Sequence, residues 1–378
     1  MKQPVASGYL PTLDGWRAIA ILGVIICHGT TAIFGPGGTY VNSRVFDLTR
    51  NGALGVDIFF GISGFLICTR LLQEEQKQGR ISLKNFYIRR GFRILPPYLL
   101  YLSVLALIWA LGLVALHKLD LLSCLFFFRN YVAGSWYTGH FWSLAVEEHF
   151  YFLWPGLLLL LGAKRGLIIA VTLALAVAVW RPIEYHYGFV SHYLPGANFY
   201  LRTDLRIDAL LWGCWAALLF HMDFWRARLT RLLNPAVWFG LAAAYVFCVV
   251  KAPHFSATLE AIIIPLLLIG TILHPLWWLG RVLETPPMRW IGRISYGLYL
   301  WQQLFTAVGA DRFPSTVGYL QQFPLNIVAI FGCASLSYYL LERRMIRTGH
   351  ALTPRRPLPV TLVQPELSVP SPTSSSGA

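Results

Sequence analysis

Residues 13–28 read LDGWRAIAILGVIICH, an apolar run that we interpret as the first membrane-crossing helix. Arg17 and His28 stand eleven positions apart. At about 100° per residue they lie on nearly the same helix face, about 16 Å apart along its axis. An ionisable side chain inside a bilayer is costly, so it usually faces a protein interior or an aqueous cavity. The pair therefore indicates an anion held at the membrane surface by Arg17 and proton transfer further in at His28.

The composition is that of a polytopic membrane protein, because 56% of the 378 residues are hydrophobic and only 13% are charged. The net charge of +14 would suggest nucleic-acid binding in a soluble chain. Here the basic residues cluster in short loops beside apolar spans, where they set topology. None of the six cysteines forms a CxxC pair, so we interpret them as buried hydrophobic residues. We expect an all-α transmembrane bundle that does not bind nucleic acid.

The chain contains about ten apolar segments long enough to cross a bilayer. A further run, 119–131, is short, and we interpret it as interfacial or re-entrant. With ten crossings the basic clusters between spans fall on one side, which the positive-inside rule assigns to the cytoplasm together with both termini. An eleventh crossing at 119–131 would place the later clusters outside. The predicted spans are 15–34, 54–72, 94–116, 140–161, 165–181, 199–220, 235–250, 257–280, 290–308 and 323–342.

Residues 1–347 are therefore predicted to form one transmembrane domain. Asp14 and Arg17 open the first span, and no convincing small-residue cleavage site follows it. We expect this span to be retained rather than removed as a signal peptide. Beyond Arg347 the composition changes to Pro, Ser and Thr, which predicts a disordered cytoplasmic tail over 348–378.

Three arginines are predicted near the cytoplasmic face, each followed directly by apolar helix: Arg17, Arg90 and Arg93. Arg90 and Arg93 stand three positions apart and so project from one face of the third span. Convergent guanidinium groups suit a multiply phosphorylated ligand, because they bind phosphate in bidentate fashion. Ordinary positive-inside arginines beside lipid headgroups are the alternative.

A second set of polar residues is predicted in the middle and outer half of the membrane. A histidine paired with a carboxylate at similar depth is the usual arrangement of a general base, which favours His28 with Glu147 or Glu148. An internal salt-bridge network, with Arg206 neutralising Asp204 or Asp208, is the alternative for the sixth span. The spacing matches no metal-ligand signature, so we predict no metal site. The set comprises His28, Asp57, Ser63, Glu147, Glu148, Asp204, Arg206 and Asp208.

At these residues the chain resembles the bacterial membrane acyltransferase family 3, whose members O-acylate carbohydrates and some other acceptors. The first span, with Arg17 and His28, is similar to that family's arginine–ten residues–histidine motif. The chain departs from the family pattern at His149, where glutamine is usual, and at Gln302-Gln303, where histidine and proline are common. The other similar blocks are GVDIFFGISGF (55–65), RRGFRILP (89–96), WSLAVEEHFY (142–151), RIDALL (206–211) and WIGRISYGLYLW (290–301).

The resemblance implies a multi-pass enzyme of the bacterial inner membrane with acyl-CoA, which we expect to be acetyl-CoA, as co-substrate and no permanently bound cofactor. Arg17, Arg90 and Arg93 would hold the nucleotide phosphates. His28, oriented by Glu147 or Glu148, would deprotonate a hydroxyl of a carbohydrate or glycolipid acceptor; an acyl-histidine relay is the alternative. The residues expected to bind this acceptor are Asp57, Ser63, Asp204, Arg206 and Asp208.

The family often carries a fused extracytoplasmic hydrolase-like domain, for which we find no segment here. We therefore expect the enzyme to act alone or to hand its product to proteins of cell-envelope biosynthesis. The competing interpretation is a transporter or flippase for a lipid-linked glycan or an organic anion, which would also place charges around a cavity. It predicts repeated halves with broken helices, and the sequence has no such symmetry.

Overall fold

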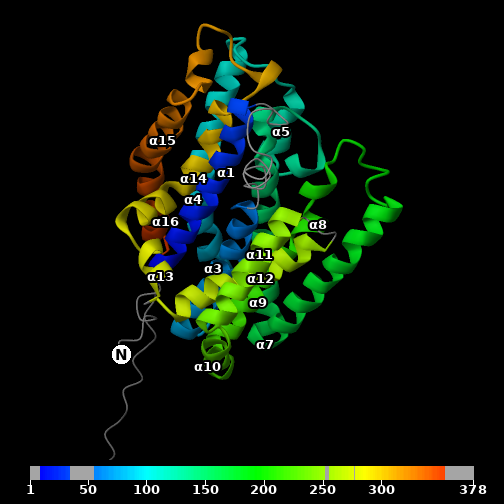
Figure 1. The fold of residues 1–378 in the computed structure, drawn as a ribbon, viewed down its shortest axis with the longest axis vertical. Coiled ribbons are helices and arrows are strands. Elements are labelled where there is room, and N and C mark those ends of the chain that lie inside the picture. Colours follow the sequence, from blue (N-terminus) through cyan, green and yellow to red (C-terminus); the bar gives the residue numbers. More distant parts are fainter. Residues whose placement is uncertain (1–8, 35–54, 252–254, 276, 354–378) are drawn as a thin grey trace, which may run out of the picture.

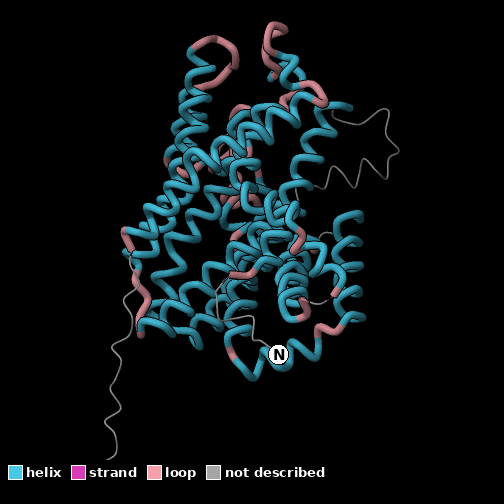
Figure 2. Tube along the Cα trace, turned by 90° about the vertical axis from the view of Figure 1, so that its left-hand side faces the viewer, coloured by secondary structure: helices cyan, strands magenta, loops and turns pink. Residues whose placement is uncertain are grey.

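A computed structural model describes residues 9–34, 55–251, 255–275 and 277–353 of the chain. Within these ranges every regular element is a helix, and Figure 2 shows helices joined by loops without strands. Six helical segments are long and apolar enough to cross a membrane, or seven if the bent pair α10 and α11 forms one span. The expected helical membrane bundle is confirmed, whereas its ten crossings and the cytoplasmic side of its termini stay predictions.

The helices follow one another through the bundle in the order of Figure 1, with short connections between most of them. The first half contains α1 (Pro11–Phe34), α3 (Gly55–Gln78), α4 (Leu83–Ala110), α5 (Lys118–Leu125), η2 (Arg129–Tyr131), α6 (Trp136–Gly139), α7 (Phe141–Tyr187) and η3 (Phe199–Leu201). The second half contains α8 (Thr203–Arg206), α9 (Asp208–His221), α10 (Asp223–Leu232), α11 (Pro235–Lys251), α12 (Ser256–Leu273), α13 (Trp278–Leu283), α14 (Pro286–Phe305), η4 (Gly309–Asp311), η5 (Gly318–Gln321), α15 (Leu325–Ser337), η6 (Tyr338–Glu342) and α16 (Arg343–Ala351).

Glycines allow the central helices to approach until their backbones touch. A Cβ added at Gly64 of α3 would lie 2.0 Å from the backbone oxygen of Leu210 on α9, and one at Gly292 of α14 would lie 1.9 Å from that of Asp14 on α1. Small residues at helix interfaces permit such close packing inside membranes, where the hydrophobic effect does not drive helices together. One of these close approaches joins α3 to α9, and the other joins α1 to α14.

The α1–α14 contact can be tested with Gly292→Ala. We expect this variant to lose about 1–3 kcal/mol of stability, because the new methyl group would force two backbones apart. The matched control is Gly240→Ala on α11, where an added Cβ meets nothing within 4 Å. Thermal unfolding of both purified variants in detergent measures the difference, and equal midpoints would show that α1 and α14 do not pack as described.

Helix α7 folds back on itself at Gly162, whose φ of 69° and ψ of 174° are not helical. A Cβ at Gly166 would lie 2.9 Å from Leu158, eight residues earlier in the chain. Likewise, His149 contacts Thr203 while Trp180 contacts the neighbouring Asp204. A straight helix would place His149 and Trp180 about 47 Å apart. The two legs of α7 are therefore antiparallel and correspond to the predicted spans 140–161 and 165–181; the second leg is the long green helix at the edge of Figure 1.

Two predicted segments contain only short helices. The sixth predicted span, 199–220, is divided into the one-turn α8 and the 14-residue α9, with a break at Ile207. Within 119–131 the helix α5 has eight residues, about 12 Å of length, which is too short to cross a bilayer. The structure thus agrees with treating 119–131 as a segment that does not span the membrane.

The last helix continues past the predicted domain boundary at residue 347. Helix α16 ends at Ala351, and a Cβ at Gly349 would lie 2.8 Å from Phe92, which shows that α16 packs against α4. Thr353 is also buried. Of the predicted tail, residues 354–378 lie outside the described part of the chain.

Candidate active site

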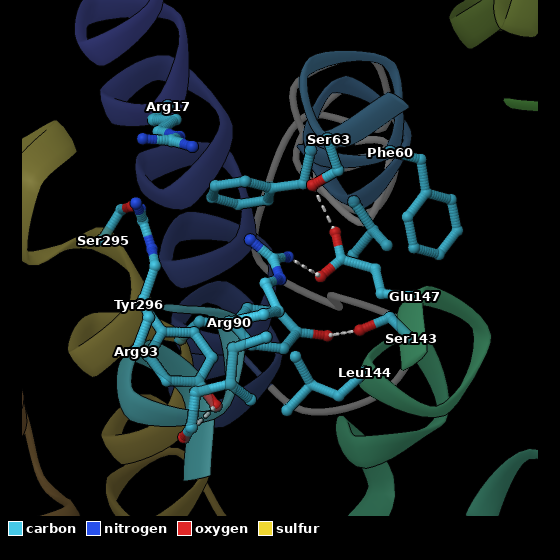
Figure 3. A pocket seen from close by; sticks show the side chains of 14 residues that line it. Arg17, Phe60, Ser63, Arg90, Arg93, Ser143, Leu144, Glu147, Ser295 and Tyr296 are labelled. Carbon is cyan, nitrogen blue, oxygen red and sulfur yellow. Dashed lines mark hydrogen bonds and ion pairs between the residues drawn. The ribbon is translucent and has the colours of Figure 1, made fainter. Parts of the chain in front are cut away.

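A pocket with an empty volume of about 660 Å³ lies among α1, α3, α4, α7 and α14 (Figure 3). Arg17 enters from α1, Ser63 from α3, Arg90 from α4 and Glu147 from α7. These side chains come from sequence blocks that lie up to 130 residues apart, and the fold brings them to one cavity. Arg93 lines the same pocket, so all three predicted arginines surround one cavity, while their binding of a phosphorylated ligand stays a prediction.

Glu147 is bound from two sides within this pocket. The Ser63 hydroxyl donates a hydrogen bond of 2.6 Å to Glu147 Oε1, and Arg90 Nη2 lies 4.0 Å from Glu147 Oε2 (Figure 3). The Arg90 guanidinium also stacks 3.7 Å above the centre of the Tyr151 ring. A carboxylate held in this way is an acceptor with a fixed position. It anchors Arg90 at the pocket wall.

Two of the three predicted arginines form an ion pair. Arg17 lies 3.7 Å from Asp14 and Arg90 lies 4.0 Å from Glu147, whereas Arg93 has no ion-pair partner among the residues that the structure describes. Arg90 Nε is buried and has no hydrogen-bond partner in the same part of the chain. Partly desolvated guanidinium groups gathered around one cavity are suited to bind an anion with several charged oxygens.

A second, larger cavity of about 1,610 Å³ adjoins the first. Arg17, Ser63, Arg90 and Arg93 line both cavities. The second cavity extends toward the C-terminal end of α3 and toward α16, where Lys77 and His350 line it. We call the larger cavity the basic vestibule. It gives an anionic ligand a continuous space from the predicted cytoplasmic side to Glu147.

Arg89 differs from its neighbours in the same sequence run. Its Nη2 lies 2.7 Å from Glu74 Oε2, so its charge is already neutralised by α3. The ion pair favours a structural role for Arg89 over ligand binding.

His28 lies away from Glu147. Its Nδ1 is 2.8 Å from Gln302 Oε1 of α14, and its ring meets the Trp136 ring edge-on at 5.3 Å. His28 lines neither the pocket nor the basic vestibule. The expectation that Glu147 or Glu148 orients His28 is therefore wrong, because Gln302 occupies His28 Nδ1. Glu147 is instead bound by Ser63 and Arg90. It lies at the depth of Arg17, about three helical turns from His28.

Glu148 faces differently from its neighbour. Consecutive residues of a helix point about 100° apart, and Glu148 does not line the pocket that Glu147 enters. No hydrogen bond to Glu148 is present among the described residues. The sequence pattern could not distinguish the two glutamates, because both stand in one motif.

The residues predicted to bind the acceptor are divided among three places. Ser63 belongs to the Glu147 pocket. Asp57 forms an ion pair with Arg206, whose guanidinium lies 5.7 Å from the Trp142 ring. The remaining two, Asp204 and Asp208, each pair with an arginine that the sequence analysis did not single out.

Those two arginines are Arg181 and Arg202. Arg181 Nη2 donates to both carboxylate oxygens of Asp208, at 2.8 and 2.7 Å, and Arg202 donates to Asp204 and to the buried Glu184. A salt-bridge network is present in this region, but Arg206 forms its ion pair with Asp57 and not with Asp204 or Asp208. The second leg of α7 supplies Arg181, and only its fold-back at Gly162 brings it there.

Two further pocket residues were not predicted as site residues. Ser143 and Tyr299 line the end of the pocket away from the vestibule, and their hydroxyl groups are 2.6 Å apart. Both lie within sequence blocks that resemble the acyltransferase pattern, which is the signal that could have identified them. As for metal ions, no group of three or more His, Cys, Asp or Glu side chains suited to hold one occurs within the ranges that the structure describes.

Comparison with known proteins gives one family and several relatives. The family model described as "Acyltransferase domain" matches residues 10–342. The peptidoglycan O-acetyltransferase OatA of Listeria monocytogenes is 30% identical over 90% of this chain and 56% of its own length. The putative peptidoglycan O-acetyltransferase YrhL of Bacillus subtilis is 28% identical over 92% of this chain and 56% of its own. The chain thus spans just over half the length of these relatives. No solved structure matches.

Proposed function

This chain belongs to the family whose model is described as "Acyltransferase domain". On this premise we propose that it is an integral-membrane O-acetyltransferase acting on a cell-envelope carbohydrate. Membership confirms the resemblance in the sequence. The acceptor class is taken from the relatives, two of which are named as acting on peptidoglycan. The donor is acetyl-CoA, a co-substrate rather than a resident cofactor.

The observation that carries this proposal is the basic vestibule that adjoins the Glu147 pocket. Acetyl-CoA has three phosphate groups on its nucleotide side and a thioester at the end of a long arm. Arg17, Arg90 and Arg93 bind the phosphates at the mouth, and Arg93 forms no ion pair among the residues that the structure describes. The arm then extends past Ser63 and Glu147 toward Ser143 and Tyr299.

His28 performs the chemistry in this proposal. It removes the proton from the acceptor hydroxyl as that oxygen attacks the thioester carbonyl, and the proton then passes to the departing thiolate of coenzyme A. An acyl-histidine intermediate is the second route to the same products. The hydrogen-bonded pair Ser143 and Tyr299 lies at the end of the Glu147 pocket away from the basic vestibule. The arm of acetyl-CoA therefore passes this pair to approach His28.

The acceptor binds in the outer half of the membrane domain. Asp57 and Arg206, beside the Trp142 ring, offer a carboxylate, a guanidinium and an aromatic face to a sugar. Asp208 with Arg181 extends this polar region along α9. Asp204 is engaged by Arg202 and by the indole of Trp180, which favours a structural role for it. Ser63 supports the donor side through Glu147.

In the proposed topology the chain crosses the bacterial inner membrane ten times with both termini in the cytoplasm. Ten segments result when the two legs of α7 are counted separately, α8 is joined with α9, α15 is joined with η6 and α16, and the short helices α5, α6, α10 and α13 are left out. The basic clusters then lie on the side of the vestibule, as the positive-inside rule requires. Proteins that synthesise or export the cell envelope are the proposed partners.

Acetyl transfer by the purified protein tests the proposed function. Full-length chain in phospholipid vesicles is given acetyl-CoA with a radiolabelled acetyl group and either peptidoglycan fragments or an unrelated polysaccharide. We expect label in an alkali-labile ester on the carbohydrate. Label confined to coenzyme A, together with passage of an organic anion or lipid-linked glycan across the vesicle membrane, would instead support the transporter or flippase.

A further inference from the structure

A hydrogen-bonded chain of two glutamine side chains connects His28 to the backbone of α6. Gln303 Nε2 donates to the carbonyl oxygen of Trp136 at 2.8 Å, and Gln302 Nε2 donates to Gln303 Oε1 at 3.0 Å. Gln302 Oε1 lies 2.8 Å from His28 Nδ1. Gln302 is fully buried and Gln303 is 3% exposed, so water does not compete for these groups.

The direction of these bonds is fixed by their first member. A backbone carbonyl oxygen can only accept, so Gln303 must present its NH₂ group to Trp136 and its oxygen to Gln302. Gln302 must then present its own NH₂ group to Gln303 and its oxygen to His28. Turning either amide around would place two acceptors or two donors opposite each other in a buried site, which is costly.

The imidazole tautomer follows from this direction. Because Gln302 Oε1 is an acceptor, His28 Nδ1 must carry the hydrogen. His28 Nε2 then holds the lone pair, and no hydrogen bond to it occurs among the residues that the structure describes. The Trp136 ring, 5.3 Å from the imidazole centre, limits its rotation, and the Trp136 indole donates to the Gln303 carbonyl oxygen at 3.0 Å. One residue therefore fixes both the ring and the amide chain.

We propose that Gln302 is a positioning residue that holds His28 with Nδ1–H bonded to its amide oxygen, so that Nε2 is the nitrogen that takes the acceptor's proton. This inference rests on the proposed function. In the balanced step, Nε2 receives the hydroxyl proton, the acceptor oxygen bonds to the thioester carbonyl carbon, and the carbon–sulfur bond breaks. The thiolate then takes the proton from Nε2. Gln302 remains bonded to Nδ1–H throughout and is not consumed.

An amide in this position has a different consequence from a carboxylate. A neutral acceptor fixes the tautomer without adding a negative charge to favour the imidazolium form. Both glutamate and leucine at this position lose the N–H donor to Gln303. Glutamate keeps the acceptor for His28 and adds a negative charge, whereas leucine keeps the volume and removes the acceptor. The two substitutions separate orientation of the base from its proton affinity.

The experiment measures acetyl transfer by full-length variants in vesicles, with kcat, KM for acetyl-CoA and the pH dependence of kcat/KM. We expect Gln302→Leu to lower kcat at least about tenfold with KM within about twofold, because the imidazole is no longer held in the reactive tautomer and the ring loses its orientation. We expect Gln302→Glu to retain kcat within about threefold and to move the acid limb of the pH profile upward by about one unit. Gln303→Leu should act in the same direction as Gln302→Leu but less strongly.

Gln321→Leu is the matched control. Gln321 is also buried, at 1% exposure, and bonds to Leu304, Tyr137 and Phe313 rather than to His28. Its loss should lower the unfolding temperature without moving the pH limb. His140, the other imidazole near His28, is unchanged in every variant. A pH limb that is the same in Gln302→Glu and wild type, or equal kcat in Gln302→Leu and Gln321→Leu, would overturn the proposal.

The same set of proteins distinguishes failure of this inference from failure of the proposed function. If His28→Ala retains activity, His28 is not the base, and the mechanism under the proposed function fails whatever the glutamine variants show. If His28→Ala loses activity but Gln302→Leu keeps it, only the positioning role of Gln302 is excluded.

Discussion

Arg90→Ala is expected to weaken binding of coenzyme A about 10- to 100-fold. A hydrogen bond to a charged group contributes about 1.5–3 kcal/mol, and about 1.4 kcal/mol corresponds to a tenfold change in affinity. Arg90 lies where the pocket and the basic vestibule meet, and stacking on Tyr151 holds its guanidinium in place. Equilibrium binding of coenzyme A to the purified protein measures this effect without any need for the acceptor.

Arg89→Ala is the control for that measurement. Arg89 is the preceding residue and also faces the vestibule, but Glu74 neutralises it at 2.7 Å, so we expect its loss to change affinity less than about threefold. Arg90→Lys should be intermediate, because lysine keeps the charge and loses the bidentate geometry. If Arg89→Ala and Arg90→Ala weakened binding equally, the arginines would act only through their summed charge and no defined phosphate site would exist.

The sequence predicted the parts of the site that depend on local geometry. The eleven-residue separation of Arg17 and His28, and the three-residue separation of Arg90 and Arg93, follow from helical periodicity once a span is recognised. Arg17, Arg90 and Arg93 do meet around one cavity. The apolar segments also predicted where most helices lie, because a bilayer-spanning helix needs a long apolar run.

The partners of the buried charges could not be predicted, because they are set by contacts between distant segments. Arg206 stands beside Asp204 and Asp208 in the sequence, yet it pairs with Asp57, 149 residues away. Arg181 reaches Asp208 only because α7 reverses at Gly162. His28 finds Gln302 across 274 residues, where the sequence pattern suggested a glutamate. Glu147 meets Ser63 and Arg90 because it lies at the same depth in the bundle, and the motif alone does not give this depth.

His28→Ala is expected to lower kcat for acetyl transfer about 10²- to 10⁴-fold, the usual contribution of a general base. Coenzyme A affinity should change less than about twofold, because His28 lies about 16 Å along α1 from Arg17 and lines neither cavity. His274→Ala is the control: this imidazole stacks on Trp277 and bonds to the Thr230 carbonyl oxygen at the end of α12, away from the site. It should keep kcat within about threefold, as a substitution away from the reacting groups does.

The same variant separates the two chemical routes. If His28 carries the acetyl group, wild-type protein given labelled acetyl-CoA without acceptor retains label on the chain, and His28→Ala does not. If His28 is only a base, neither protein retains label, and the loss of kcat alone reports its role. The Gln302 bond leaves Nε2 without a hydrogen-bond partner among the described residues, and this suits both routes, since a lone pair on that nitrogen can take a proton or attack a carbonyl carbon. Unchanged kcat in His28→Ala would exclude both, and the reacting base would then have to be sought at Glu147, the ionisable acid inside the donor pocket.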